Sequence, residues 1–224
     1  MISRSLFALS LLLASPHIQG SWGVAYAPME SSTPKPAIVF LHGMWSSPED
    51  SCESFESAAT PFGFLVCPRG NAPLGDSGDL KMWAGTYANA ARMIHAALDV
   101  AEALAPGKLE RRQGGTLLGF SNGAYFAAEV ACSEPGRWSG LVLMSMRLDL
   151  DPKRLAAAGV KRVVLAAGEQ DASRGSMEKL AQRLNGAGVE ARFMSLGDVG
   201  HAFPKDMGER MSAAIGWVRG ANSP

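Results

Sequence analysis

The chain has 224 residues, of which 47% are hydrophobic and 19% charged, a balance typical of one globular domain with a substantial core. The 21 Lys and Arg residues equal the 21 Asp and Glu residues in number, so the formal net charge is 0. This balance gives no electrostatic reason to expect nucleic acid or an anionic membrane as a partner. No apolar run reaches the roughly 18 residues that a membrane-spanning helix needs, so no membrane span is expected.

The N-terminal segment differs in composition from the rest of the chain. Arg4 precedes an apolar stretch from Leu6 to Ala14, and small or turn-forming residues follow. This is the layout of a secretory signal peptide, so we expect an exported protein, periplasmic or secreted. We place the signal peptide at residues 1–20, although no A-x-A triplet marks the cleavage site. Residues 21–34, rich in Ser, Pro and Gly, are expected to form a lead-in segment.

The remainder, residues 35–220, alternates between short apolar runs and longer helical stretches. The runs are continuous rather than alternating, which is typical of strands buried on both faces of a parallel sheet. The six predicted strands are 37–42, 62–67, 115–120, 140–146, 162–167 and 191–196. The predicted helices are Tyr87–Ala105, Asn122–Cys132, Ser176–Leu184 and a last helix that Pro204 opens and that runs to Trp217. The sequence therefore predicts an α/β fold, a doubly wound, mostly parallel sheet with helices on both faces. The long irregular stretch 68–86 is a candidate binding loop.

A Gly-x-Ser-x-Gly motif lies at 119–123, between a predicted strand and a predicted helix. In hydrolases this turn presents the serine as a nucleophile, and the two glycines let strand and helix approach each other without side-chain clashes. The motif alone is a weak signal, but the regular strand GTLLGF before it supplies the expected context. The pattern favours Ser121 as a nucleophile over a serine that merely caps a helix.

The general base is predicted from chain order. Folds built around this turn place the acid and the histidine after the serine. The sequence has four histidines, and only His201 follows Ser121. His17 lies in the predicted signal peptide, and His42 and His95 also precede the serine. His201 comes between the last predicted strand and the last predicted helix, at the carboxyl edge of the sheet.

The acid has more than one candidate. Asp171 follows the strand 162–167 and therefore lies at the same edge of the sheet, so we expect it to orient the imidazole. Asp198 is only three residues from His201, a spacing that seldom gives the required geometry within one loop. Asp149 and Asp151 follow an earlier strand and remain alternatives.

The third component is an oxyanion hole, which needs two backbone N–H donors aimed at the developing negative charge. One is expected from Asn122, directly after the nucleophile. The other is expected from Met44, which follows a His-Gly dipeptide after the first long strand. His42 is then expected to shape this loop rather than to take part in catalysis.

Four motifs in this order, HGMW, GFSNGA, GEQD and GHAF, make the chain similar to the α/β-hydrolase superfamily. Within it, the chain resembles the small lidless esterases, a branch with phospholipase/carboxylesterases, dienelactone-hydrolase-like and polyhydroxyalkanoate-depolymerase-like proteins. The resemblance covers about residues 35–220. It implies an α/β-hydrolase fold and ester chemistry. Dienelactone hydrolases proper have a cysteine at the position of Ser121, so their particular activity is not implied.

Apolar residues are expected around the mouth of the site. Trp45, Trp83 and Phe203 are the predicted substrate-binding residues. The segment between Met146 and Pro152 is too short for the lid that many lipases insert there, so no lid domain is expected. An open apolar site suits a small-molecule or polymer-end ester.

Topology predicts one disulfide. Cys52 follows the first long strand and Cys67 ends the next one, so both lie at the carboxyl edge of the sheet. Cys132 ends a helix that runs away from this edge. Only Cys52 and Cys67 are therefore placed within bonding reach. Export would supply the oxidising compartment in which such a bond persists.

We expect a serine hydrolase that cleaves carboxylic esters through an acyl-enzyme. The alternatives are a serine peptidase, an acyltransferase and a catalytically silent binding protein on the same fold. Peptidases usually carry a screening domain, for which this chain has no room, and silent relatives usually lack one triad member. The sequence has no phosphate-binding GxxxxGK[ST], no HExxH and no CxxC, so no cofactor and no metal is expected.

Overall fold

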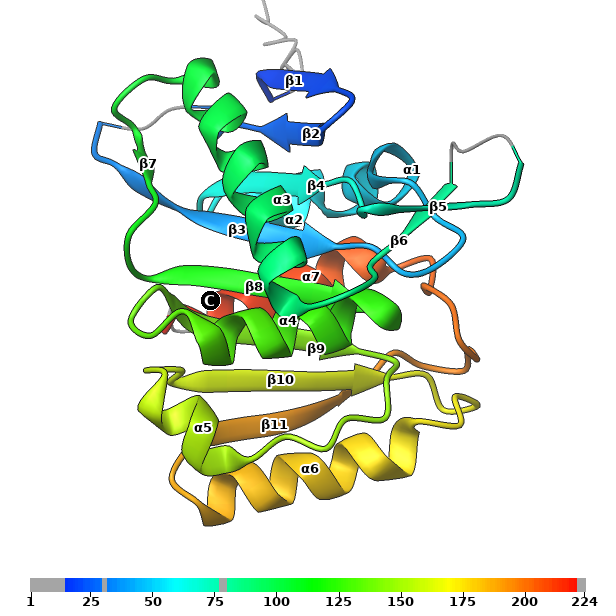
Figure 1. Ribbon diagram of the computed structural model, residues 1–224. Coiled ribbons are helices and arrows are strands. Elements are labelled where there is room, and N and C mark those ends of the chain that lie inside the picture. Colours follow the sequence, from blue (N-terminus) through cyan, green and yellow to red (C-terminus); the bar gives the residue numbers. More distant parts are fainter. Residues whose placement is uncertain (1–14, 30–31, 77–79, 221–224) are drawn as a thin grey trace, which may run out of the picture.

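The computed structural model describes residues 15–29, 32–76 and 80–220. Its centre is one sheet with the strand order β1-β2-β4-β3-β8-β9-β10-β11, and β7 pairs with the amino end of β3 (Figure 1). The pairs β1–β2 and β2–β4 are antiparallel, and every other pair along this order is parallel. The predicted mostly parallel α/β sheet is thus confirmed.

The strands of the central sheet are short. They are β1 (His17–Gly20), β2 (Gly23–Tyr26), β3 (Lys35–Leu41), β4 (Phe64–Pro68), β7 (Leu109–Glu110), β8 (Gly115–Phe120), β9 (Trp138–Met144), β10 (Arg162–Ala167) and β11 (Glu190–Ser195). The six predicted strands correspond to β3, β4, β8, β9, β10 and β11, with ends that agree within two residues. The predicted irregular stretch 68–86 contains a separate antiparallel ribbon of β5 (Ala72–Leu74) and β6 (Leu80–Met82).

The helices connect these strands. They are α1 (Pro48–Cys52), α2 (Glu56–Ala59), α3 (Tyr87–Ala101), α4 (Asn122–Ser133), α5 (Pro152–Ala157), α6 (Arg174–Gly186) and α7 (Met207–Val218), with 3-10 turns at Glu53–Phe55 and Glu102–Leu104. The prediction that Pro204 opens the last helix is wrong, because α7 begins at Met207. The N–H of Met207 donates to the carbonyl of Pro204 across a turn, 3.2 Å. The fixed φ of proline suits a turn as well as a first helical position.

Helices cover both faces of the sheet. In Figure 1, α3, α4 and α6 lie in front of it and α7 lies behind it. Successive strand residues alternate between the two sides: Leu117 packs in the core under α3 and α4, and Leu118 packs in the core under α1 and α7. Because both faces are buried, the central strands are apolar at nearly every position. This explains why they appear in the sequence as continuous apolar runs.

The N-terminal part of the described chain is an antiparallel hairpin. β1 pairs with β2 in the register His17↔Tyr26 to Gly20↔Gly23, and the backbone N–H of Ser15 donates to a carboxylate oxygen of Glu56. The predicted signal peptide, residues 1–20, therefore overlaps β1. Its apolar part, up to Ala14, lies outside the described residues.

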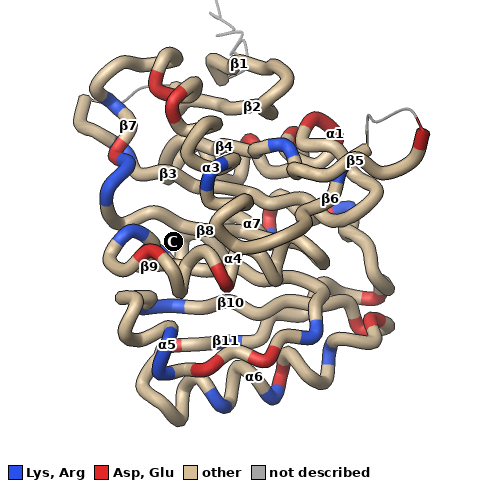
Figure 2. The backbone as a smooth tube through the Cα atoms, viewed as in Figure 1, with Lys and Arg blue, Asp and Glu red and all other residues tan. Residues whose placement is uncertain are grey.

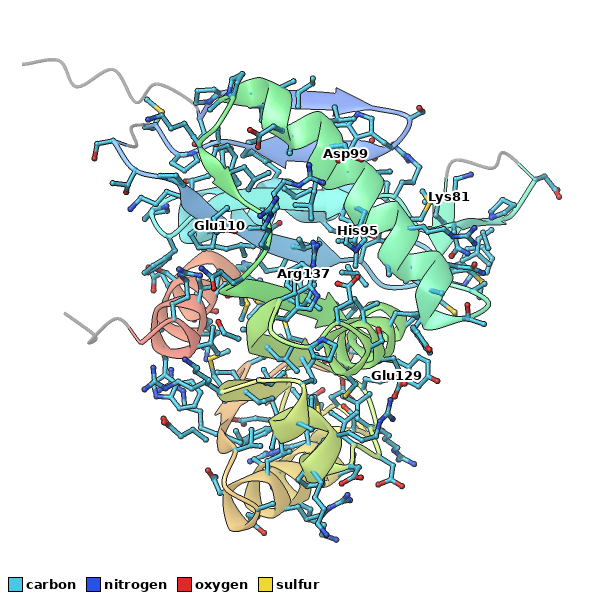
Figure 3. The ribbon with its side chains drawn as sticks, turned by 60° about the vertical axis from the view of Figure 1, so that its left-hand side comes forward. Lys81, His95, Asp99, Glu110, Glu129 and Arg137 are labelled. Carbon is cyan, nitrogen blue, oxygen red and sulfur yellow. A yellow bond between two sulfur atoms is a disulfide. The ribbon has the colours of Figure 1, made fainter. Side chains whose placement is uncertain are left out.

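In Figure 2, residues of both charge signs are interspersed along the backbone. Several of them form ion pairs between elements. Glu134, after α4, contacts both His95 of α3 and Arg137. Figure 3 shows the side chains of His95 and Arg137 on the same face of the molecule. Within the described ranges, no helix is both long and apolar enough to cross a membrane.

Candidate active site

The turn between β8 and α4 holds Ser121 in a rare backbone conformation, with φ 53° and ψ −121°. The close packing around it depends on two glycines. A Cβ on Gly119 would lie 2.5 Å from the Cα of Ala124, and one on Gly123 would lie 2.1 Å from the carbonyl oxygen of Leu41. Both distances are impossible for real atoms, so the glycines are needed where strand and helix meet. The predicted turn is therefore present in the structure.

Ser121 is the first member of a hydrogen-bonded series. Its Oγ lies 2.9 Å from Nε2 of His201, and Nδ1 of His201 lies 3.0 Å from Oδ2 of Asp171. Since the carboxylate only accepts, Nδ1 carries the proton and Nε2 is free to accept from the Ser121 hydroxyl. The Asp171 side chain is only 3% exposed, whereas that of His201 is 53% exposed. The three residues predicted for this site thus lie together.

Asp171 is held by groups that the sequence analysis did not identify. Its Oδ1 accepts from both the backbone N–H and the hydroxyl of Ser173, each at 2.7 Å. Burial by itself would raise the pKa of Asp171. Hydrogen bonds from Ser173 and His201 oppose this effect, and the pKa of Asp171 lies below its usual range. The spacing Asp-x-Ser is a local signal for such a turn and could have indicated Ser173.

The other candidate acids have different partners. Asp198 accepts from the side-chain amide of Gln170, 2.7 Å. Asp149 pairs with Arg183, and Asp151 caps α5 by accepting the N–H of Lys153. None of the three is hydrogen-bonded to His201 in the described part of the chain. Asp171 is therefore the carboxylate that the fold places against the histidine.

The acid loop and the histidine loop pack directly against each other. A Cβ on Gly168 would lie 2.0 Å from the carbonyl oxygen of Val199, so only glycine fits there. The N–H of Gln170 donates to the same carbonyl, 3.1 Å, and the N–H of Glu169 donates to Gly197, 2.9 Å. These contacts fix Asp171 relative to His201 through the backbone.

The loop after β3 carries the predicted oxyanion donor Met44. It lies close to the serine turn, since a Cβ on Gly43 would be 3.0 Å from the ring of Phe120. No acceptor in the described chain takes the N–H of Met44 or that of Asn122, the first residue of α4. Both predicted donors therefore remain available for a bound oxygen atom.

His42 is buried and links this loop to the segment after β4. Its Nδ1 lies 2.8 Å from the carbonyl of Gly43, and its Nε2 accepts the N–H of Gly70, 3.0 Å. Both ring nitrogens are therefore occupied in a single neutral tautomer. Burial lowers the pKa of His42, and the positive charge of Arg69 nearby acts in the same direction. The prediction that His42 shapes the loop agrees with these contacts.

Of the predicted mouth residues, Trp83 is buried, and Phe203 is half-buried against Phe120, whose ring also contacts His201. Trp83 is only 1% exposed, and its indole N–H donates to the carbonyl of His42, 3.0 Å, so it supports the loop instead of lining an open mouth. Phe203 is half-buried against the rings of Phe40, Phe55 and Phe120. Large aromatic side chains bury much apolar area, and here the core provides the partners.

Trp45, the third predicted substrate-binding residue, lies at the surface. It is 62% exposed, and Met44 beside it is 45% exposed. The next residue, Ser46, pairs with Lys81 of β6, which joins the loop to the β5–β6 ribbon. Tyr125, in the first turn of α4 after Ser121, is 45% exposed. Exposed apolar side chains thus lie on both segments that flank the serine.

The structure has a disulfide between Cys52 and Cys67, the predicted pair, with Cα atoms 6.1 Å apart, and Cys132 is free. The bond joins the end of α1 to β4. Together with the ion pair between Glu49 and Arg69, it ties the loop after β3 to the loop after β4. The covalent link therefore connects the helix that follows the predicted oxyanion loop to the neighbouring strand.

Several solved structures with the same fold are described as serine hydrolases or esterases. The fluorophosphonate-binding serine hydrolase FphF of Staphylococcus aureus is 13% identical, with a TM-score of 0.67 over 94% of this chain and all of its own. Esterase PE8 is 21% identical, with a TM-score of 0.63 and coverage of 92% and 98%. The S-formylglutathione hydrolase FrmB of Staphylococcus aureus is 16% identical, with a TM-score of 0.61 and coverage of 88% and 89%. The protein therefore has the α/β-hydrolase fold.

Sequence comparison alone gives no such match. No protein-family model and no curated protein matches the chain. At identities this low, similarity of structure establishes the fold, and the chemistry has to be argued from the residues of the site.

Proposed function

We propose that this protein is a serine hydrolase that cleaves carboxylic esters through an acyl-enzyme intermediate. The observation that carries the proposal is the series from Ser121 through His201 to Asp171, with contacts of 2.9 and 3.0 Å. It lies on a turn whose serine has a positive φ, a conformation that folded proteins retain mainly where function uses it. The esterases among the structures with this fold support the same chemistry.

In the proposed reaction, Oγ of Ser121 attacks the ester carbonyl carbon while its proton passes to Nε2 of His201. The C–O bond to the alcohol then breaks, and His201 returns the proton to the leaving oxygen. Water adds to the acyl carbon and gives a proton to His201, which passes it back to Ser121 as the acid leaves. Asp171 stays ionised throughout and stabilises the imidazolium.

The negative charge on the carbonyl oxygen needs donors in both addition steps. The N–H groups of Met44 and Asn122 are proposed for this role, because neither has an acceptor in the described chain. Preorganised donors of this kind contribute roughly 3 kcal/mol each in comparable sites. Exposed Met44, Trp45 and Tyr125 support an apolar substrate group bound at the surface of the molecule.

A panel of p-nitrophenyl esters from acetate to palmitate tests this function, run beside an aminopeptidase substrate and a polyester emulsion. We expect ester turnover by the wild type and none by Ser121→Ala. Turnover of the amide alone would identify a peptidase instead. If the wild type neither turns over any substrate nor is labelled by a fluorophosphonate, the protein is a binding protein on the hydrolase fold.

We also propose that the protein is exported. The disulfide between buried Cys52 and Cys67 supports an oxidising compartment. Cleavage after Gly20 would remove β1 and expose the edge of β2, so a cleavage site before His17 suits the fold better. Intact mass of the protein recovered from a periplasmic or culture fraction tests both points. Recovery of the full-length chain from the cytoplasm alone would contradict export.

A further inference from the structure

The residue after the nucleophile has a side-chain contact that hydrolysis by itself does not require. Oδ1 of Asn122 accepts the backbone N–H of Trp83, 2.8 Å. The indole N–H of Trp83 in turn donates to the carbonyl of His42, 3.0 Å. Two hydrogen bonds through one buried tryptophan thus join the start of α4 to the loop after β3, across 39 and 41 residues of sequence.

The other end of this connection fixes the direction of an oxyanion donor. Nδ1–H of His42 donates to the carbonyl of Gly43, 2.8 Å. This carbonyl belongs to the same peptide unit as the N–H of Met44, and in a planar trans peptide the two groups point in opposite directions. The hydrogen bond from His42 to the Gly43 carbonyl therefore also fixes the direction of the Met44 N–H.

The His42 ring is itself held from outside the loop. Its Nε2 accepts the N–H of Gly70, 3.0 Å, and Gly70 packs so closely that a Cβ would lie 2.6 Å from the carbonyl oxygen of Met82. Met82 is the neighbour of Trp83. Gly70 thus contacts the ring of His42, and Trp83 contacts its carbonyl.

We propose that the side chain of Asn122 is a positioning residue: through Trp83 and His42 it fixes the N–H of Met44 relative to the N–H of Asn122. The proposal rests on the proposed ester hydrolysis and adds a residue role to it. Such donors act because they are held in place before the charge develops. A misplacement of about 1 Å can lower a rate by about 100-fold.

Asn122→Leu tests the first link, because it keeps the backbone N–H and the branching at Cγ but removes the acceptor for Trp83. We expect kcat to fall by about 10- to 100-fold with little change in KM, since oxyanion donors act mainly in the transition state. Binding of a trifluoromethyl ketone, whose serine adduct carries an oxyanion, should weaken by a similar factor. The acid limb of the pH–rate profile should not move, because the base is untouched.

Trp83→Phe tests the second link, because it removes the indole donor to His42 and keeps the backbone donor to Asn122. If both residues act along one connection, the double variant loses less than the product of the two single losses. This variant also serves if Asn122→Leu fails to fold. Independent, fully multiplicative losses in the double variant would overturn the proposed connection.

Asn71→Ala is the matched control. Asn71 makes two hydrogen bonds to the backbone of Ala84, in the same segment as Trp83, but touches neither His42 nor the serine turn. We expect its kcat and inhibitor affinity to equal those of the wild type. A wild-type kcat in folded Asn122→Leu, or an equal loss in Asn71→Ala, would refute the positioning role. A wild type inactive on every ester would instead refute the proposed function.

Discussion

Oγ of Ser121 and Nε2 of His201 lie 2.9 Å apart although 80 residues separate them in the chain. The sheet brings them together, because both follow the carboxyl ends of parallel strands, β8 and β11. The ring of Phe120, directly before the serine, packs 5.0 Å from the His201 ring between centroids. The pair is thus positioned by the backbone topology and by the contact of the Phe120 ring with the His201 ring.

Ser121→Ala should abolish labelling by a fluorophosphonate and lower kcat by about 10⁶-fold, because the nucleophilic oxygen is lost. Labelling is followed by intact mass and turnover with a p-nitrophenyl ester. Ser133→Ala, at the far end of α4, is the control and should label once, like the wild type. Labelling that survives in Ser121→Ala would contradict the assigned nucleophile.

Asp171→Asn should lower kcat by about 10⁴-fold, since an amide at this position favours the wrong imidazole tautomer. Steady-state kinetics at neutral pH measure the effect. Asp198→Asn and Asp149→Asn are matched controls, because those carboxylates bind Gln170 and Arg183 instead of His201. An unchanged kcat in Asp171→Asn, together with an inactive control variant, would show that another carboxylate orients the histidine.

The lowered pKa of His42 gives the protein a pH-dependent stability. Below the ordinary histidine pKa of 6.5 the unfolded chain takes up a proton at this residue, whereas the folded protein keeps it neutral until its lower pKa is reached. The free energy of unfolding should therefore fall with decreasing pH in that window, by at most about 1.4 kcal/mol per pH unit for one proton. Urea unfolding at pH 7 and pH 5 measures this slope.

His42→Gln should remove this part of the slope, because glutamine does not titrate while its side-chain oxygen can still accept from Gly70. His95→Gln, at the α3 contact with Glu134, is the comparison at another histidine. An unchanged slope in His42→Gln would show that His42 is not the group responsible.

The disulfide should contribute about 3 kcal/mol to stability, the magnitude for a loop of about 15 residues. Cys52→Ser with Cys67→Ser in one variant should lower the midpoint of thermal unfolding. Cys132→Ser is the control and should leave the disulfide in place. Non-reducing peptide mapping checks the pairing directly, and a bridge to Cys132 would contradict the structure.

Trp45→Ala should raise KM for long-chain esters several-fold and leave the acetate ester almost unchanged. The reason is that Trp45 offers exposed apolar surface beside the proposed oxyanion donor, and each buried CH₂ group contributes about 0.8 kcal/mol. Met29→Ala, another exposed apolar residue in a different segment, is the control. Equal KM changes across the whole ester series would exclude a role in chain recognition.

Local patterns in the sequence were enough to predict much of the fold. The apolar runs predicted all six parallel central strands because strands buried on both faces tolerate little else. Chain order predicted His201 as the base. The pairing of Cys52 with Cys67 was predicted because β4 and the segment after β3 share the carboxyl edge of the sheet. These inferences depend only on periodicity and topology, which a single sequence expresses directly.

Tertiary structure alone decided which side chains meet. The sequence pattern places both Asp171 and Asp198 near the carboxyl edge of the sheet. In the structure, Asp198 is hydrogen-bonded to Gln170, and Asp171 is hydrogen-bonded to His201. Trp83 was expected at the mouth, yet its indole is buried on the carbonyl of His42. Hydrogen bonds between residues far apart in the chain depend on angles and packing that periodicity does not encode. The tautomer of His42 and the side-chain contact of Asn122 could therefore be found only in the folded molecule.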